Sequence, residues 1–400
     1  MYAVQFDPTS LVLITAAVAL APILSAAVPV VLVPTVVVEL LLGILIGPDV
    51  LDIASEGPFV TFLAAIGMSF LFFLAGMELD LGRVRGRPLR LAATGMGVSL
   101  VLAGVVAGGL ALAGLVDVLL PIMIALFTTA IGSLIPILSD AGELDSDFGT
   151  QVLATGAVGE FVPIVMIAVF LAGQHGTFTA VAVLVLFVAA AGALAAVALR
   201  VRPPHVVRTI EQTLHASGQL GVRLALLVLF VLLWLAYNLH LDLALAGFAA
   251  GLLVGVLTQG ERADPVRQRL EGIGFGLFVP FFFVTSGLRL DLDALLSSTT
   301  ALVLLPVFLA CFLVVRGAPA LLARTALDRS AIVPLALCSA TALPLLVAVT
   351  RIAVEEGELS GEIAASLVGA GLVSVLVFPA AAVALRRSAR AAAPPAEAPA

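Results

Sequence analysis

Long apolar stretches separated by short polar segments limit how this chain can fold more than any other feature of its sequence. Divided at its charged residues and Gly/Pro clusters, the chain has thirteen such stretches, each near the roughly 20 residues that a helix needs to cross a bilayer. They cover approximately residues 10–28, 31–48, 58–77, 89–114, 118–138, 148–172, 177–199, 220–239, 242–259, 272–289, 299–322, 331–350 and 362–385. Only 11% of the residues are charged and 62% are apolar, more than soluble cores can bury. We therefore predict an all-α polytopic membrane protein, which excludes a secreted disulfide scaffold, a nucleic-acid binder and a cytosolic enzyme.

The arginines support this number of helices and give an orientation. All 19 basic residues are arginines. If residues 83–90 face the cytoplasm, sixteen arginines lie in cytoplasmic segments, and two, Arg289 and Arg351, lie outside. Such an excess is typical of the cytoplasmic side. We expect a protein of the plasma (inner) membrane with its N-terminus outside and its C-terminus in the cytoplasm.

The segments outside the apolar stretches are too short to form a separate soluble domain. Residues 1–386 are expected to form one transmembrane domain, with 203–219 as a polar linker along the surface and the Ala/Pro-rich residues 387–400 as a disordered cytoplasmic tail. The N-terminus has no basic region, so the first apolar stretch is predicted to be a retained helix. Cys311 and Cys338 lie in apolar runs and are interpreted as small hydrophobic residues.

Four short motifs recur in order along the chain. LGILIG at 42–47 resembles AGLLVG at 250–255, and GMELDL at 76–81 resembles GLRLDL at 287–292. SLIPIL at 133–138 resembles TALPLL at 341–346, and GEL at 142–144 recurs at 357–359. The spacing corresponds to seven helices, an odd number, so the repeats must have opposite orientations. We predict two inverted six-helix repeats, approximately 10–172 and 220–385, joined by a connector helix at 177–199; this arrangement is typical of alternating-access transporters.

Two helices at equivalent repeat positions carry signals for interruption. Threonines, Gly132 and Ser133 precede Pro136 in one, and Ser339 and Thr341 precede Pro344 in the other. Proline removes a backbone donor, and non-helical backbone at membrane depth is tolerated where it lines a cavity. We expect discontinuous helices there; two continuous helices kinked at proline and packed through small residues are the alternative.

Ionisable residues within membrane helices are functional candidates because they are costly to bury. Glu160 is the deepest acid and Arg316 the only deep cation. Glu160 could bind a proton and a cation alternately, with Arg316 as a fixed counter-charge, because arginine does not deprotonate in proteins. The two residues could also form a purely structural pair. Glu39 could lie near the site or be hydrogen-bonded at a helix interface.

Other charged residues carry weaker signals. Asp140, Glu143, Asp145 and Asp147 are expected in a solvated cytoplasmic loop, with an acidic funnel for cations as the sharper alternative. No phosphate-binding loop, nucleotide fingerprint or hydrolase triad occurs, so we expect neither a cofactor nor enzymatic activity.

Three segments resemble a known family. PTVVVELLLGILIGP at 34–48, FLAGMELD at 73–80 and FFVTSGL at 282–288 look like the monovalent cation:proton antiporter-2 family, which has the sodium/proton exchanger fold. The resemblance covers approximately residues 10–386. It implies a homodimer with a dimerisation domain and a mobile core domain in which the two discontinuous helices cross. It also implies an elevator-like movement and an acidic ion carrier at Glu160. The pattern departs at Gly159, where family members usually have Asp, Asn or Gln.

These observations predict a secondary active antiporter that exchanges Na⁺ or K⁺ for H⁺. Deprotonated Glu160 would bind the cation with polar groups of the two interrupted helices, and protonation would release it. The groups expected to contribute are those of Thr129, Ser133, Ser339 and Thr341. A single carboxylate beside Arg316 suggests one-for-one, electroneutral exchange. An organic-anion or bile-acid-type symporter and a non-transporting membrane scaffold or sensor remain alternatives.

Overall fold

The chain is described by a computed structural model in which all regular secondary structure of the described residues is helical. The described residues are 7–27, 35–78, 86–131, 134, 137–138, 141–144, 146–167, 170, 185, 189, 192, 219–239, 241, 243–258, 264–290 and 292–391. Within them, nine helical stretches are long and apolar enough to cross a membrane, and two apolar helices are shorter. This confirms a multi-pass helical protein. The predicted connector helix at 177–199, except for three single residues, and the linker at 203–219 lie outside the described residues.

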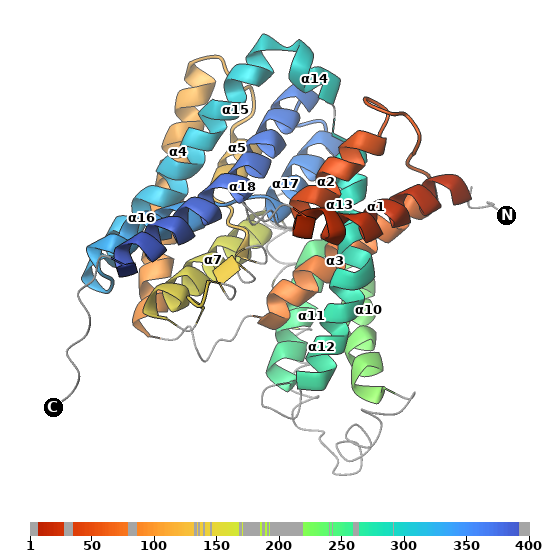
Figure 1. Cartoon of the computed structure of the whole chain (residues 1–400), viewed down its shortest axis with the longest axis horizontal. Coiled ribbons are helices and arrows are strands. Elements are labelled where there is room, and N and C mark those ends of the chain that lie inside the picture. Colours follow the sequence, from red (N-terminus) through yellow and green to blue (C-terminus); the bar gives the residue numbers. More distant parts are fainter. Residues whose placement is uncertain are drawn as a thin grey trace. The chain divides into compact units, whose positions relative to one another are not determined.

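The chain divides into two compact units, each described here separately (Figure 1). The first comprises residues 1–26, 38–81 and 164–290, and the second 27–37, 82–163 and 291–400. The helices mainly in the first unit are α1 (Pro8–Ala27), α2 (Thr35–Ile46), α3 (Pro58–Glu78), α10 (Leu220–Asn238), α11 (Leu243–Leu257), α12 (Asp264–Ile273), the π-helical η3 (Gly274–Phe278) and α13 (Val279–Leu288). Those mainly in the second are α4 (Arg87–Leu112), α5 (Leu119–Leu126), α7 (Asp147–Met166), α14 (Leu292–Ser297), α15 (Thr299–Phe312), the π-helical η4 (Leu313–Gly317), the 3₁₀-helical η5 (Ala318–Thr325), α16 (Arg329–Ser339), α17 (Pro344–Glu355) and α18 (Gly361–Ala391).

Two helix boundaries differ from the prediction. The helix predicted at 272–289 is preceded by a further helical segment, α12, which begins at Asp264. An ion pair between Arg267 and Glu271, one turn apart at 2.9 Å, supports helix in this polar segment. At the other end of the chain, α18 continues to Ala391, into the segment that we expected to be disordered. Alanine has the highest helix propensity, which favours this extension. The rest of the predicted tail lies outside the described residues.

Close backbone packing between α3 and α11 organises the first unit. Gly247 and Gly251 on α11 lie directly against the backbone of α3 at Ser69 and Phe73. Small residues let two helix backbones approach in this way, which is how membrane helices pack without a hydrophobic driving force between them. An ion pair between Arg289, at the end of α13, and Glu56, before α3, closes one end of this unit.

The second unit is built around α16 and α17. The stretch from Arg329 to Glu355 is the most buried of the nine apolar stretches: 83% of its most apolar 18-residue segment is buried inside the protein. α15 and α18 pack along each other, and α18 also contacts α16 and α17 (Figure 1). A helix that is apolar on all sides belongs in the interior of a bundle. The α16–α17 stretch is therefore the core of this unit.

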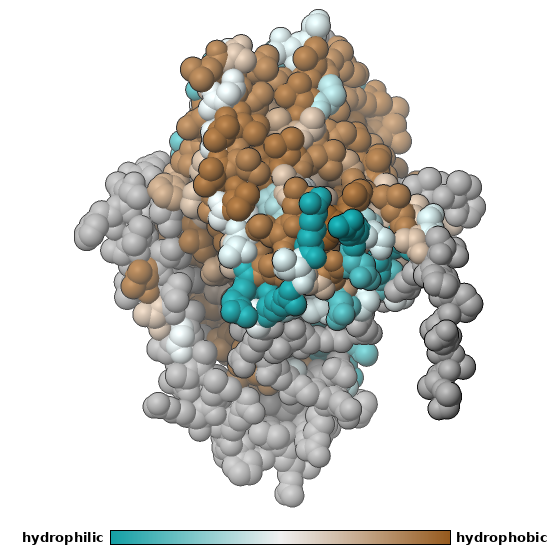
Figure 2. Space-filling view, turned by 90° about the vertical axis from the view of Figure 1, so that its left-hand side faces the viewer, coloured by the Kyte–Doolittle hydropathy of each residue, from teal (hydrophilic) through white to brown (hydrophobic). Residues whose placement is uncertain are grey.

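The outer surface of the second unit is suited to lipid. Val101, Val105 and Leu112 on α4 are exposed, at 67%, 66% and 93% of their maximum. Figure 2 shows a broad apolar area on the face that it presents, with hydrophilic residues gathered along one side of that area. Exposed apolar side chains on this scale are typical of a membrane-facing surface.

We predict that Gly251→Ala destabilises the first unit. A Cβ atom there would overlap the carbonyl oxygen of Phe73 and lie 2.9 Å from the amide nitrogen of Met77. These are backbone atoms of α3, so the helices must separate, and overpacking costs about 1–3 kcal/mol. The melting temperature of the protein in detergent should fall.

The matched control for this change is Gly104→Ala on α4. Its new Cβ atom would lie 3.8 Å from the sulfur of Met123, an ordinary contact, and the melting temperature should be kept. Equal melting temperatures for Gly251→Ala and Gly104→Ala would contradict the proposed role of the α3–α11 contact.

Candidate functional site

Two helices of the second unit are interrupted. α5 ends at Leu126, residues 128–130 are not helical, and helical backbone resumes at Ile131. α16 ends at Ser339, residues 341–343 are not helical, and α17 begins at Pro344. Proline suits the first turn of a helix because it needs no donor there. Both interruptions occur where the sequence predicted them.

The two interruptions lie against each other and exchange hydrogen bonds. The amide of Ala130 donates to the carbonyl oxygen of Thr341 at 2.8 Å. The hydroxyl of Thr129 donates to the carbonyl oxygen of Ser339 at 2.7 Å. Ser374 on α18 accepts a further hydrogen bond from the amide of Ala342 at 3.0 Å. Backbone groups that lose their helical partners at the interruptions are thus paired by other parts of the same unit.

Glu160 projects from α7 to the first interruption. Its carboxylate is buried, with the residue 6% exposed, and Oε1 accepts a hydrogen bond from the amide of Ile131 at 2.9 Å. Ile131 is where helical backbone resumes after the interruption. A carboxylate at the start of a helical segment is stabilised by the free amide groups and the dipole of that segment. The structure therefore brings the deepest acid of the chain to the interrupted backbone.

Arg316 approaches the same interruption from the other side. It is 2% exposed and lies within the π-helical turn η4. Its Nε donates to the Thr129 hydroxyl at 2.8 Å, Nη1 to the Ser99 hydroxyl at 3.2 Å, and Nη2 to the carbonyl oxygen of Thr155 at 3.2 Å; Nη1 also lies 4.0 Å from the sulfur of Met96. Within the described part of the chain, all these partners are neutral.

Thr129 connects the elements of this site. Its hydroxyl accepts from Arg316 and donates to Ser339, and its amide donates to the carbonyl oxygen of Gly159 at 3.2 Å. One residue of the first interruption is therefore bonded to η4, to the end of α16 and to α7. The sequence indicated Thr129 as a candidate ligand, but not this connecting position.

The other predicted hydroxyl residues differ in what they contribute. The hydroxyls of Ser339 and Thr341 donate to the carbonyl oxygens of Leu335 and Leu337 in α16, at 2.7 and 3.1 Å. Their backbone carbonyls, not their side chains, face the first interruption. Ser133 lies outside the described residues.

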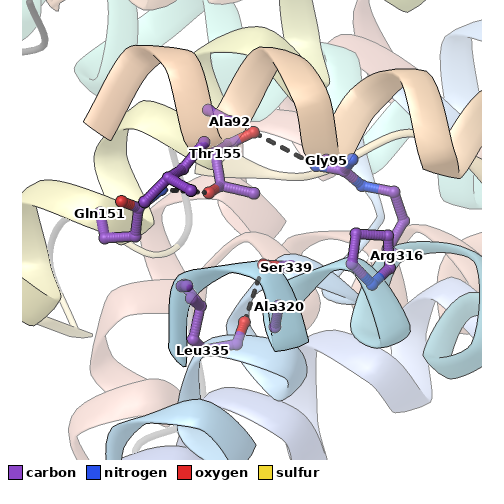
Figure 3. A pocket seen from close by; sticks show the side chains of 11 residues that line it. Ala92, Gly95, Gln151, Thr155, Arg316, Ala320, Leu335 and Ser339 are labelled. Carbon is purple, nitrogen blue, oxygen red and sulfur yellow. Dashed lines mark hydrogen bonds between the residues drawn. The ribbon is translucent and has the colours of Figure 1, made fainter. Parts of the chain in front are cut away.

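A small cavity adjoins Arg316 within the second unit (Figure 3). Its polar lining includes Gln151 and Thr155 on α7, together with Ser339 and Arg316. The side-chain amide of Gln151 donates to the Thr155 hydroxyl at 3.3 Å. The volume, about 20 Å³, is enough for one water molecule. Gln151, Thr155 and Ser99 are site neighbours that sequence reasoning missed.

The remaining candidate acids lie elsewhere. Glu39 is 5% exposed on α2 in the first unit, and its Oε2 has no hydrogen-bond partner among the described residues. Glu143 is 3% exposed, and Arg386 donates to its two oxygens at 3.2 and 3.3 Å, so the expected solvated loop is wrong for this residue. Asp147 is exposed at the start of α7, whereas Asp140 and Asp145 lie outside the described residues. Cys311 and Cys338 are buried and unpaired, as predicted.

The family described as "Sodium/hydrogen exchanger, transmembrane" matches residues 13–385 of this chain. The chain belongs to this family. YjbQ of Bacillus subtilis is 25% identical over 363 residues, which cover 87% of this chain and 58% of YjbQ. The Na(+)/H(+)-K(+) antiporter GerN of Bacillus cereus is 24% identical over 263 residues, 66% of this chain and 67% of GerN. The chain thus spans little more than half the length of YjbQ.

A solved structure gives the same fold assignment. The sodium proton antiporter MjNhaP1 of Methanocaldococcus jannaschii, determined at pH 8, matches with a TM-score of 0.65 and 16% identity. The match covers 95% of this chain and 96% of MjNhaP1. The predicted resemblance to the exchanger family is therefore confirmed.

We predict that Thr129→Val destabilises the second unit, although the two side chains are nearly the same size. The change leaves Nε of Arg316 and the carbonyl oxygen of Ser339 buried without these partners. Buried groups left unpaired cost about 1–3 kcal/mol each. The melting temperature in detergent should fall by several degrees.

Thr350→Val on α17 is the control. Thr350 is equally buried, but its hydroxyl bonds only the carbonyl oxygens of Leu346 and Val347 in its own helix. These carbonyls belong to a continuous helix, so little stability should be lost. A larger loss for Thr350→Val than for Thr129→Val would show that Thr129 is not a connecting residue.

Proposed function

We propose that this protein is a secondary active antiporter that exchanges Na⁺ or K⁺ for H⁺, with Glu160 carrying either ion. The observation that carries the proposal is the position of the Glu160 carboxylate, buried at the interruption of a membrane helix and bonded to the amide of Ile131. A carboxylate in this position can bind either a proton or a monovalent cation, each of which neutralises its charge. Membership of the exchanger family supports a role for both ions. The name of GerN includes Na⁺ and K⁺, so both cations stay candidates.

The surroundings of Glu160 suit a cation that has lost its water. Interrupted backbone offers carbonyl oxygens and helix ends, the groups that replace a hydration shell in membrane transport sites. We propose that Thr129, Ser133, Ser339 and Thr341 contribute oxygen atoms to the bound cation. For Ser339 and Thr341 these would be the backbone carbonyls, because their hydroxyls are engaged within α16 or at its end.

The division into two units supports an elevator-like mechanism. Glu160, Arg316 and both interruptions belong to the second unit, whereas the close α3–α11 packing belongs to the first. We propose that the second unit is the moving core and the first is the dimerisation domain of a homodimer. The proposal includes thirteen helices in two inverted repeats, crossed at the interruptions, with the N-terminus outside and the C-terminus in the cytoplasm of the plasma (inner) membrane.

Arg316 has a consequence for stoichiometry. It adds one positive charge to the core in every state, because arginine stays protonated. With Glu160 neutralised by a proton or by a monovalent cation, the two loaded forms carry the same net charge. We therefore propose one-for-one, electroneutral exchange. The family match favours this reading over an anion symporter in which Arg316 would bind the substrate.

The central test is Glu160→Gln in proteoliposomes that contain a pH-sensitive dye. Adding NaCl or KCl outside should move protons in the wild type, and the glutamine variant should show no cation-dependent signal because its amide cannot ionise. Glu355→Gln, which removes an exposed acid at the end of α17, is the control and should transport normally. Unchanged exchange in a folded Glu160→Gln protein would refute the proposal.

Stoichiometry has its own test. In proteoliposomes whose membrane potential is clamped at different values, the initial rate of cation-dependent proton movement should be the same at each voltage. A rate that rises or falls steadily with voltage would overturn electroneutrality and leave the assignment of Glu160 intact.

A further inference from the structure

Position 159 on α7 has no side chain, and the space that a side chain would need is taken by Arg316. A Cβ atom built on Gly159 would lie 2.5 Å from Nη2 of Arg316, 2.7 Å from Oγ1 of Thr129 and 2.8 Å from Cβ of Thr129. Real Cβ contacts essentially never fall below 3.0 Å. Any other residue at 159 must therefore displace Arg316, Thr129 or both.

The guanidinium in this space is held by three parts of the second unit. Ser99 comes from α4, the Thr155 carbonyl from α7, and Thr129 from the first interruption. The donors of a guanidinium have a fixed planar arrangement, so three bonds in different directions determine its position. The Ser99 hydroxyl in turn donates to the carbonyl oxygen of Val315 at 2.8 Å, beside Arg316 in its own π-helical turn.

Gly159 and Glu160 are consecutive, and both are bonded to the first interruption. The carbonyl oxygen of Gly159 accepts from the amide of Thr129, and the carboxylate of Glu160 accepts from the amide of Ile131. Thr129 bonds the guanidinium of Arg316 and Ile131 bonds the carboxylate of Glu160, so two residues of the first interruption place both charged groups. A shift of Thr129 or Arg316 would change the charge environment of the acid without touching the acid itself.

We propose that Gly159 is a positioning residue, matched to Arg316: its missing side chain makes the room in which the guanidinium stands as a built-in cation beside Glu160. This proposal rests on the proposed role of Glu160 as the ion carrier. In this proposal, the space beside Gly159 is filled by the guanidinium of Arg316, which comes from η4 and not from α7. Position 159 and position 316 must then be compatible with each other in size.

The test is a double-mutant cycle of Gly159→Ala and Arg316→Lys. Gly159→Ala should lower the rate of cation-driven proton exchange by about tenfold or more, since small misplacements in a site are costly. Lysine keeps the charge but lacks the outer end of the fork, where Nη2 would meet the new methyl group. The double variant should therefore transport faster than Gly159→Ala alone. If the fold-decreases in exchange rate of the two single variants multiply in the double variant, the two residues act independently and the proposal is overturned.

Gly104→Ala provides the matched cycle, because its Cβ atom would meet nothing closer than 3.8 Å. It should leave exchange unchanged, and its effect should be independent of Arg316→Lys. A Gly159→Ala protein as active as Gly104→Ala would also overturn the proposal.

Unfolding temperatures of the same four proteins in detergent give a second readout that needs no transport. Gly159→Ala should lower the melting temperature of the wild type more than that of Arg316→Lys; equal decreases would contradict the matched pair. If Gly159→Ala alone does not fold, recovery of a monodisperse double variant supports the proposal, and failure of both variants to fold contradicts it. Exchange that persists in Glu160→Gln would refute the carrier role of Glu160. The melting temperatures would still test the match between positions 159 and 316 independently.

Discussion

Every backbone group inside a membrane must find a partner in the protein, and this requirement determines the structure around the two interrupted helices. Each unpaired amide or carbonyl in lipid costs several kcal/mol. Here the interruptions satisfy one another: Ala130 bonds Thr341, Thr129 bonds Ser339, and Ser374 bonds Ala342 from α18. Each interruption therefore finds hydrogen-bond partners outside its own helix. A local departure from the helix has thus become a fixed contact between segments more than 200 residues apart in sequence.

The same pairing accounts for the positions of the two buried charges. The amide of Ile131, released by the interruption, bonds the carboxylate of Glu160, and the hydroxyl of Thr129 bonds the guanidinium of Arg316. Burial of a charge is tolerable only where hydrogen bonds replace water. The interruption supplies one such bond to the carboxylate and one to the guanidinium, so both charged groups contact the same short segment. These bonds help two charged residues to remain in the interior of an apolar bundle.

The sequence predicted what depends on local pattern. Apolar runs located most of the described helices to within a few residues, although α12 begins earlier than predicted. Pro344 marked the start of α17, and Glu160 stood out because charges are rare in such runs. It did not predict the partners. Ser99 and Ser374 are serines with apolar neighbours in the sequence, and nothing in those neighbours distinguishes them from packing positions. The π-helical turn at Arg316 and the burial of Glu143 by Arg386 likewise depend on tertiary contacts that no local pattern encodes.

Glycine allows two kinds of close contact in this protein, one with the backbone of a neighbouring helix and one with side chains. In the first unit, Gly247 and Gly251 place backbone against backbone, and the contact atoms have no freedom of their own. In the second unit, Gly159 faces side chains, the guanidinium of Arg316 and the hydroxyl of Thr129. Side-chain contacts can be adjusted by rotation, whereas backbone contacts must separate as whole helices. A new side chain at Gly159 must therefore move Arg316 or Thr129 out of their hydrogen bonds, whereas one at Gly251 must separate two helices.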